Sequence, residues 1–448
     1  MDLDLLSDRP TTTEVGSYFV ANYPPFSVWT PEHVPSYVRT LDAPADDPRR
    51  TPLGLYIHIP FCRKRCKFCY FRVYTDKNSS DVDTYLTALA REAALYADRA
   101  ALRERNFDFV YFGGGTPSFL SSDQLQRLID RISEHWLWEN AREVTFECEP
   151  GTLKKGKLET IKAIGTTRLS LGIEHFDDDV LELGGRAHRS PEVFQAYEWA
   201  REVGFPQINI DLIAGMVGDT EDKWKLTVEK ALALNADSVT IYQMEVPHNT
   251  EIARDARRSG STTPVPSWAT KRWWIDYAFR TFEKSGYEVS SAYTLVKPSP
   301  PPSGGEVKGF VYRDALWHGA DLIGTGVASF GHLGGVHYQN VDTWEGYVEA
   351  LERGELPLSR ALRITDRQRL IREAILQLKL GRLDAAYFRE KFNEEIAVIF
   401  AEAFGSLQDE GLLAVFGDDI RLSRAGLLCV DALLPRFFEK EFHNVRYT

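Results

Sequence analysis

The sequence predicts an α/β protein in which a mostly parallel sheet curls into a partial (βα)6 barrel of the TIM type. Between residues 51 and 300, six short apolar runs alternate with longer stretches of helical periodicity. Strands that alternate with helices of ten or more residues form βαβ units, and repeated right-handed crossovers curve the sheet toward a barrel. Ligands of such folds bind at the carboxyl ends of the strands.

The predicted elements follow one another in strict alternation. The strand-like runs cover residues 55–59, 107–112, 144–147, 168–173, 207–213 and 238–243. The helical patterns that follow them cover residues 82–102, 122–135, 157–164, 191–203, 221–234 and 268–284. Apolar residues recur every three to four positions in the second set, which is typical of helices that cover one face of a sheet.

Three regions flank the predicted barrel of residues 51–300. Residues 1–50 lack a sustained period and are predicted to form an N-terminal extension. Residues 301–360 are expected to complete the barrel after an exposed loop at 297–308 that is rich in proline and glycine. Residues 361–448 carry helical patterns at 366–380 and 385–410 and then two apolar runs around Gly417, which predict a C-terminal helical, winged-helix-like domain.

Composition narrows the classes of function. The chain has 448 residues and a formal net charge of -12, which argues against a nucleic-acid partner bound through its phosphates. No run of 18 apolar residues is present, so no membrane span is expected. The acidic N-terminus lacks the pattern of a secretory signal, and we therefore expect a cytoplasmic protein.

Three of the five cysteines lie close together, directly after the first predicted strand. Cys62, Cys66 and Cys69 have three and then two intervening residues, a spacing that lets a short loop bind three corners of a 4Fe–4S cluster. The fourth iron would then be open to a ligand. A zinc site is the alternative, with His58 as the nearby fourth ligand. Cys148 and Cys429 are expected to be small buried side chains.

Five segments in this order resemble the oxygen-independent coproporphyrinogen III oxidase family of the radical S-adenosylmethionine (SAM) superfamily. They read LYIHIPFC with the two further cysteines, YFGGGTPSFLS, FECEP, INIDLIAGM and DLIGTGVASF. The resemblance implies a radical SAM barrel in which the open iron chelates SAM and one electron releases a 5′-deoxyadenosyl radical. It implies oxidative decarboxylation of coproporphyrinogen III or a related tetrapyrrole in haem biosynthesis.

The resemblance also implies which residues contact the cofactors. It assigns the cluster to Cys62, Cys66 and Cys69. It assigns contacts with SAM, and with a second SAM molecule, to Tyr56, Phe68, Gly113, Gly114, Gly115, Thr116, Glu147, Glu174, Arg186, Asp211, Glu245 and Phe330. Independently, Asp211 lies within an apolar run, so its charge must face a ligand or a basic residue, with Arg186 the expected protein partner.

The chain departs from the family pattern at three positions. Phe71 stands where the oxidases carry a further cysteine, Glu174 where glutamine is common, and Glu245 where a small residue is usual. Two other functions therefore stay open: a radical SAM C-methyltransferase that uses two SAM molecules, and a haem chaperone. Possible haem ligands are His175, His188, His332 and His337.

Two sets of basic residues are candidates for binding partners, one for the substrate and one for an electron donor. An oxidative decarboxylase needs cations for the substrate's propionates, and Arg168, Arg186, Arg189 and Arg313 are candidates by position. The run Arg63–Arg65 with Lys67 is either a solvated loop or a docking patch for an acidic electron donor such as a flavodoxin or ferredoxin.

Overall fold

The structure is a computed structural model that describes residues 19–45, 51–260, 263–298, 309–443 and 445. The chain divides into two compact units, each built from separated stretches. Unit 1 comprises Met1–Val28, Leu212–Gly309 and Thr365–Thr448, and unit 2 comprises Trp29–Asp211 and Phe310–Ile364. Because both units combine distant stretches, the four consecutive regions drawn from the sequence stay a prediction.

Unit 2 contains the first strands of a parallel sheet. These are β1 (Leu53–Ile59), β2 (Phe109–Gly114), β3 (Glu143–Cys148), β4 (Arg168–Glu174) and the first residues of β5 (Gln207–Ala214). On the other side of β1 follow β9 (Asp321–Thr325), β10 (Phe330–Leu333), β11 (Val336–Asn340) and β12 (Leu358–Arg363), of which β9 is parallel to β1 and the rest are antiparallel.

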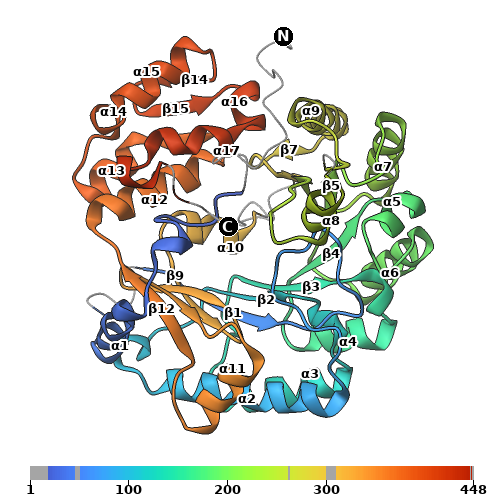
Figure 1. Cartoon of the computed structure of the whole chain (residues 1–448), viewed down its shortest axis with the longest axis vertical. Coiled ribbons are helices and arrows are strands. Elements are labelled where there is room, and N and C mark those ends of the chain that lie inside the picture. The colour runs from blue at the N-terminus through green and yellow to red at the C-terminus, as the bar shows by residue number, and fades with distance from the viewer. Residues whose placement is uncertain (1–18, 46–50, 261–262, 299–308, 444, 446–448) are drawn as a thin grey trace. The chain divides into compact units, whose positions relative to one another are not determined.

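Helices cover one face of these strands. Figure 1 shows α2 (Ser79–Ala97), α3 (Ser122–Ser133), α4 (Lys155–Ala163) and α6 (Ser190–Val203) side by side along the sheet. Capping boxes fix the starts of α2 at Asn78 and of α3 at Ser121. Unit 2 also contains α1 (Val34–Asp42), α5 (Asp178–Leu183), α10 (Val311–Trp317) and α11 (Trp344–Glu352).

The strands alternate in character, which creates a polar inner face. Leu169, Leu171 and Ile173 of β4 are fully buried on the helix-covered side. The residues between them, Arg168, Ser170, Gly172 and Glu174, point to the opposite side, because side chains alternate along a strand. We call this opposite side the inner face, and it carries the predicted cofactor residues of β1 to β5.

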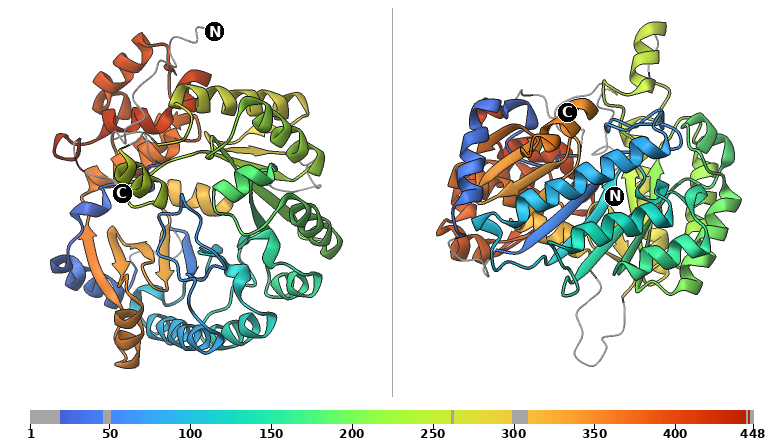
Figure 2. Two further views of the ribbon diagram at one scale, coloured as in Figure 1. Left: turned by 45° about the vertical axis from the view of Figure 1, so that its right-hand side comes forward. Right: turned by 90° about the horizontal axis from the view of Figure 1, so that it is seen from below.

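Unit 1 contains the later strands and the C-terminal region. Its elements are α7 (Glu221–Leu234), β6 (Ser238–Gln243), α8 (Glu251–Ser259), α9 (Trp268–Lys284), β7 (Glu288–Val289), β8 (Thr294–Val296), α12 (Asp366–Leu378), β13 (Arg382–Asp384), α13 (Ala385–Phe392), α14 (Ile396–Ile399), α15 (Ala401–Asp409), β14 (Leu413–Phe416), β15 (Asp419–Leu422), α16 (Arg424–Leu428) and α17 (Val430–Leu433). The antiparallel β14–β15 hairpin and the short helices of the C-terminal region belong to the red part of the ribbon in Figure 2.

The predicted fold class is confirmed: the protein is α/β with a parallel sheet and a C-terminal helical region, and all six predicted strands are present. The single helix expected at 385–410 is wrong. Asn393 ends α13 with φ +55, a left-handed conformation that cannot continue a helix, and two further short helices follow. Most of the predicted loop at 297–308 lies outside the described residues. Within the described ranges, no helix is long and apolar enough to cross a membrane.

Candidate active site

The three neighbouring cysteines lie on a loop that follows β1 and is tied down at both ends. We call residues 62–74 the cysteine loop. The N–H of Cys62 donates to the Tyr74 carbonyl at 3.0 Å, and the N–H of Tyr74 donates to the Pro60 carbonyl at 2.8 Å. The N–H of Lys67 donates to the Gly184 carbonyl just after α5. All five cysteines are free thiols.

Two side chains from other elements donate to the sulfur atoms. The Thr116 hydroxyl, after β2, lies 3.3 Å from Cys62 Sγ, and Arg186 Nη1 lies 3.4 Å from Cys66 Sγ. Burial raises the pKa of Cys62 to about 12 and that of Cys69 to about 11, and the other thiols of the loop add to both shifts. Hydrogen bonds and a nearby cation of this kind stabilise thiolates that bind metal.

The three thiols of the loop are able to surround an iron–sulfur cluster. Across the described residues, no three histidine, cysteine, aspartate or glutamate side chains converge on one ion position. The cysteines of a 4Fe–4S cluster bind different irons, so they need to surround a cube and do not need to meet at one point. His58, the fourth ligand of the zinc alternative, directs Nδ1 at the Tyr56 hydroxyl 3.3 Å away.

The glycine run at the end of β2 is required by close packing within the sheet. A Cβ on Gly114, where φ is +114, would lie 2.5 Å from the His58 ring. A Cβ on Gly115 would lie 2.8 Å from the backbone of Pro60, and one on Gly113 would meet the Tyr111 ring at 2.7 Å. These glycines therefore let the ends of β1 and β2 lie against each other beside the cysteine loop.

Glu147 and Asp211 are hydrogen-bonded carboxylates on the inner face. Glu147 accepts from the Tyr111 hydroxyl at 2.7 Å and from the N–H of Gly114 at 3.2 Å. Burial raises the pKa of Glu147 to about 7. Asp211 accepts from the Ser170 hydroxyl at 2.8 Å and from Asn209 Nδ2 at 2.9 Å.

Arg186 binds other partners than the one expected from the sequence. Its guanidinium donates to the Gly172 carbonyl at 2.6 Å and to Cys66 Sγ, and it forms an ion pair with Glu174 at 3.4 Å. Asp211, the expected partner, is not among these contacts. Burial raises the pKa of Glu174 to about 7, although the charge of Arg186 opposes that shift. Arg186 thus joins β4 to the cysteine loop.

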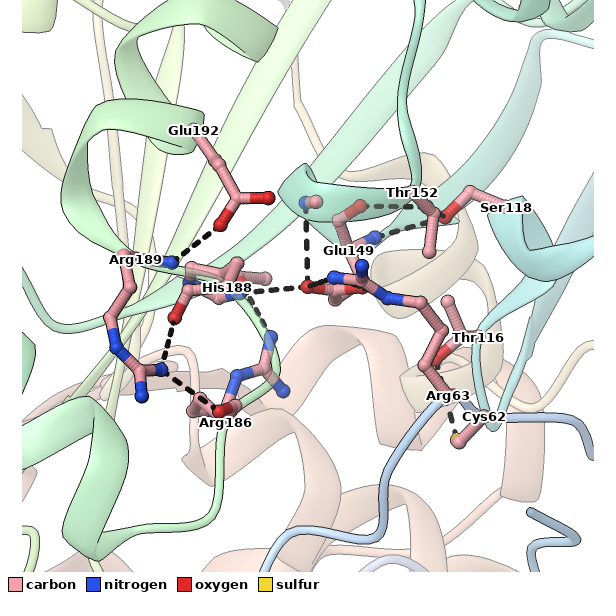
Figure 3. A network of polar contacts seen from close by, with 12 residues as sticks. Cys62, Arg63, Thr116, Ser118, Glu149, Thr152, Arg186, His188, Arg189 and Glu192 are labelled. Atoms are coloured by element: carbon pink, nitrogen blue, oxygen red, sulfur yellow. Dashed lines mark hydrogen bonds and ion pairs between the residues drawn. The ribbon is translucent and has the colours of Figure 1, made fainter.

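Sequence reasoning missed a partly buried ion-pair network centred on Glu149. Its carboxylate accepts from Arg63 Nη2 and from His188 Nδ1, both at 3.0 Å, and His188 Nε2 lies 3.1 Å from the Ile173 carbonyl. Figure 3 shows Arg63, Glu149 and His188 directed at one another beside Cys62 and Thr116. Burial would raise the pKa of Glu149, but His188 and the guanidinium groups of Arg186 and Arg63 lower it to about 2.

This network changes the interpretation of Arg63. The sequence offered a solvated loop or a docking patch for the whole basic run, whereas Arg63 has a fixed partner within unit 2. Lys64 and Arg65 are exposed, and so are Tyr70 and Phe71, whose rings lie 4.5 Å apart. A second carboxylate two residues after Glu147, in Phe146–Pro150 of the sequence, was the available signal for the network.

The remaining predicted cofactor residues of unit 2 lie on three different elements. Phe68 is half-buried in the cysteine loop, and Tyr56 stacks on Tyr111 with ring centroids 5.9 Å apart. Phe330 on β10 contacts the edge of Trp29.

Glu245 belongs to unit 1. Its carboxylate accepts from the N–H of Phe19 at 2.7 Å, and burial raises its pKa to about 8. It lines a small cavity of about 40 Å³ together with Tyr242, Trp268 and Tyr293.

The four histidines considered as haem ligands are all buried and hydrogen-bonded. His175 Nδ1 accepts from the N–H of Asp177 at 3.0 Å, and His188 belongs to the Glu149 network. Nδ1 of His332 lies 2.9 Å from Nδ1 of His337. No ring of the four is presented at the surface for an axial ligand role.

Known proteins are similar to the chain in sequence, and a solved structure is similar to it in fold. The family model described as the radical SAM superfamily matches residues 56–231. The oxygen-independent coproporphyrinogen III oxidase of a Synechocystis strain is 27% identical, over 91% of this chain and 89% of that protein. The haem chaperone HemW of Mycobacterium tuberculosis is 30% identical, over 86% of this chain and 94% of that protein. The solved structure of Escherichia coli coproporphyrinogen III oxidase (HemN) matches with a TM-score of 0.80 at 25% identity, over 94% of this chain and 96% of that one.

Proposed function

Because the chain belongs to the radical SAM superfamily, and within it to the family of oxygen-independent coproporphyrinogen III oxidases and HemW chaperones, we propose that it oxidatively decarboxylates coproporphyrinogen III or a related tetrapyrrole. The family uses a 4Fe–4S cluster and SAM. The single observation that carries the proposal is the set of contacts at the thiols: Thr116 and Arg186, two residues that the resemblance assigns to SAM, donate to Cys62 and Cys66.

In this proposal the protein holds and orients its cofactors through residues of unit 2. Cys62, Cys66 and Cys69 bind the cluster, and Glu147 and Asp211 present carboxylate oxygens that can accept from the amine or ribose hydroxyls of SAM. When bound, the cofactors supply one-electron cleavage of SAM and abstraction of a hydrogen atom from the substrate. The Glu149 network keeps the cysteine loop in place, because it joins Arg63 to β3 and to the segment after α5.

The test is anaerobic reconstitution with iron and sulfide, followed by SAM, dithionite and coproporphyrinogen III. The proposal predicts protoporphyrinogen and 5′-deoxyadenosine among the products, identified by mass spectrometry. Formation of 5′-deoxyadenosine with S-adenosylhomocysteine and a methylated product would instead identify a C-methyltransferase. Phe71, where the oxidases carry a cysteine, favours that second candidate.

A haem chaperone is the third candidate, since the HemW relatives are as similar to this chain as the oxidases are. The burial of His175, His188, His332 and His337 weighs against ligation of haem by these side chains. Stoichiometric haem binding without any turnover of SAM would favour the chaperone.

We also propose that an acidic electron donor of the flavodoxin or ferredoxin type docks on the exposed part of the cysteine loop. Lys64, Arg65 and Arg72 are exposed on the same loop as the exposed rings of Tyr70 and Phe71, and this combination of cations and apolar surface suits an acidic protein. A flavin or iron–sulfur donor and a free thiol loop both fit a reducing compartment, so we propose the cytoplasm.

Reversal of the two exposed charges tests the docking surface. Lys64→Glu together with Arg65→Glu should slow cluster reduction by a flavodoxin while reduction by dithionite keeps its rate. The same reversal at Lys155 and Lys284, which are exposed on α4 and α9, is the control. Equal slowing with both reductants would contradict the docking surface.

A further inference from the structure

One of the four arginines that the sequence offers for a carboxylated substrate differs from the other three in its contacts. Arg186 is bound to Cys66 and Glu174, Arg189 donates to Glu182 and to backbone carbonyls, and Arg313 pairs with Asp314. The guanidinium of Arg168 has no hydrogen bond or ion pair with any residue that the structure describes, and its Nε is buried without a partner.

Arg168 is nevertheless almost completely buried, with 1% of its surface exposed. It lies on the inner face of β4, two residues before Ser170 and six before Glu174. Its guanidinium carbon lies 4.0 Å from the centroid of the Phe310 ring, which covers one side of the planar group. A buried cation without hydrogen bonds is costly, so a ligand is one reason for a protein to keep it.

The nearby acidic side chains use their oxygens elsewhere. Glu143 accepts from the N–H groups of Val311 and Tyr312 at 2.9 and 3.1 Å, and from the Thr145 hydroxyl. Glu147 accepts from Tyr111 and Gly114. Both carboxylates are near enough for the charge of Arg168 to lower their pKa against the effect of burial, but neither contacts it. The donors of Arg168 are thus left for another acceptor.

Further aromatic rings follow on from Phe310. The rings of Phe310 and Tyr312 stack with centroids 6.0 Å apart, and the Tyr312 ring lies tilted against that of Tyr111 with centroids 4.3 Å apart. This wall suits a short hydrocarbon arm, and the guanidinium next to it suits a carboxylate, which it can bind through two parallel hydrogen bonds.

We propose that Arg168 binds a carboxylate group at the inner face of β4, and that this group is a carboxylated side chain of the substrate. The proposal rests on the proposed function for the identity of the substrate, a tetrapyrrole with propionate arms. The amino-acid end of SAM carries the same chemistry, so the experiment includes a probe for each source.

The main measurement is a fluorescence titration of the full-length protein with coproporphyrin III, the oxidised and unreactive form of the proposed substrate. Arg168→Met should raise the Kd by about tenfold or more, since one good charged pair is lost. Arg168→Lys keeps the positive charge but cannot form the two parallel hydrogen bonds of a guanidinium, so it should give an intermediate Kd. Arg91→Met, at an exposed position on α2, is the matched control and should keep the wild-type Kd. Thermal melts of all variants establish that each is folded.

A second arm uses small probes and needs no tetrapyrrole. By ligand-observed NMR, propionate should bind the wild-type protein and propionamide should not, and Arg168→Met should lose the difference. If L-methionine displaces propionate, the carboxylate comes from the cofactor and the assignment to the substrate is wrong. If propionate binding depends on Arg168 while coproporphyrin III fails to bind, the carboxylate site holds and the tetrapyrrole proposal fails. Equal affinities of wild type and Arg168→Met for both probes would overturn the carboxylate site itself.

Discussion

Two buried cations, one in each unit, have nearly the same surroundings except for their hydrogen bonds. Lys379 in unit 1 is fully buried, and its ammonium lies 3.6 Å from the ring centroid of Phe19. Arg168 in unit 2 is 1% exposed and lies 4.0 Å from the ring centroid of Phe310. Burial and the cation–π contact therefore do not distinguish the two side chains.

Their partners do. Lys379 Nζ donates to the Val20 carbonyl at 2.7 Å and pairs with Asp431 at 3.0 Å, so it fixes the backbone at Val20 within unit 1. Arg168 has no such contact with the described residues. The comparison teaches that a buried charge with all its partners in the protein serves the architecture, whereas one without them is available to a ligand.

Removal of Lys379 is expected to have the largest effect on stability. Lys379→Met leaves Asp431 without its cation in a buried setting, which costs about 3 kcal/mol in the free energy of unfolding. Urea denaturation measures the loss. Lys155→Met, which breaks the exposed pair with Glu202, is the control and should cost under about 1 kcal/mol. Similar losses of stability in the two variants would contradict a structural role for Lys379.

The Glu149 network should give a smaller loss. Glu149→Gln keeps the shape but weakens the hydrogen bonds from Arg63 and His188, so we expect about 1–3 kcal/mol of destabilisation and slower reconstitution of the cluster. Glu202→Gln at the surface serves as the reference. Reconstitution at the wild-type rate in Glu149→Gln would show that the network does not hold the cysteine loop.

Arg168→Met tests the second cation of the comparison, the one without hydrogen bonds. Because Arg168 has no hydrogen bond to lose, its replacement should change the free energy of unfolding by under about 1 kcal/mol, in either direction. The measurement is the same urea titration, without added ligand. A loss as large as that of Lys379→Met would identify Arg168 as a structural counter-ion of Glu143 and Glu147.

Glu245 provides a test of a different kind, the dependence of stability on pH. Burial, and then the charge of Asp431, raise the pKa of Glu245 to about 8, so the folded protein holds a proton that the unfolded chain releases near pH 4.5. The resulting stabilisation is complete below pH 4.5 and is lost as the pH rises through 8. Glu245→Gln should therefore lose less stability than the wild type between pH 5 and pH 8, as followed by thermal melts. Parallel curves would contradict the raised pKa.

Helices and strands whose apolar residues recur at a regular spacing were predictable from the sequence, and contacts between residues far apart in the sequence were not. The helices at 221–234 and 268–284 have the predicted bounds because their apolar faces repeat without interruption. The short helices α5 and α8 were missed, and Asn393 breaks the helix expected at 385–410 by a single backbone angle.

The candidate site divides in the same way. The cysteine spacing and the family motifs are local in the sequence, so they indicated the cysteine loop and the residues around it. The pairing of Glu149 with His188 joins residues 39 positions apart, and no local pattern encodes it. The choice of Glu174 over Asp211 as the partner of Arg186 likewise depends on how β4 and the segment after α5 meet.

The most direct test of the central claim, that this chain binds a 4Fe–4S cluster through the cysteine loop and uses it to cleave SAM, is an assay of iron, sulfide and 5′-deoxyadenosine after anaerobic reconstitution. We expect about four irons and four sulfides per chain and reductant-dependent 5′-deoxyadenosine in the wild type and in Cys148→Ala. Alanine at Cys62, Cys66 or Cys69 should abolish the brown chromophore and the product while the fold is kept. Iron and SAM cleavage retained in those three variants would contradict the claim.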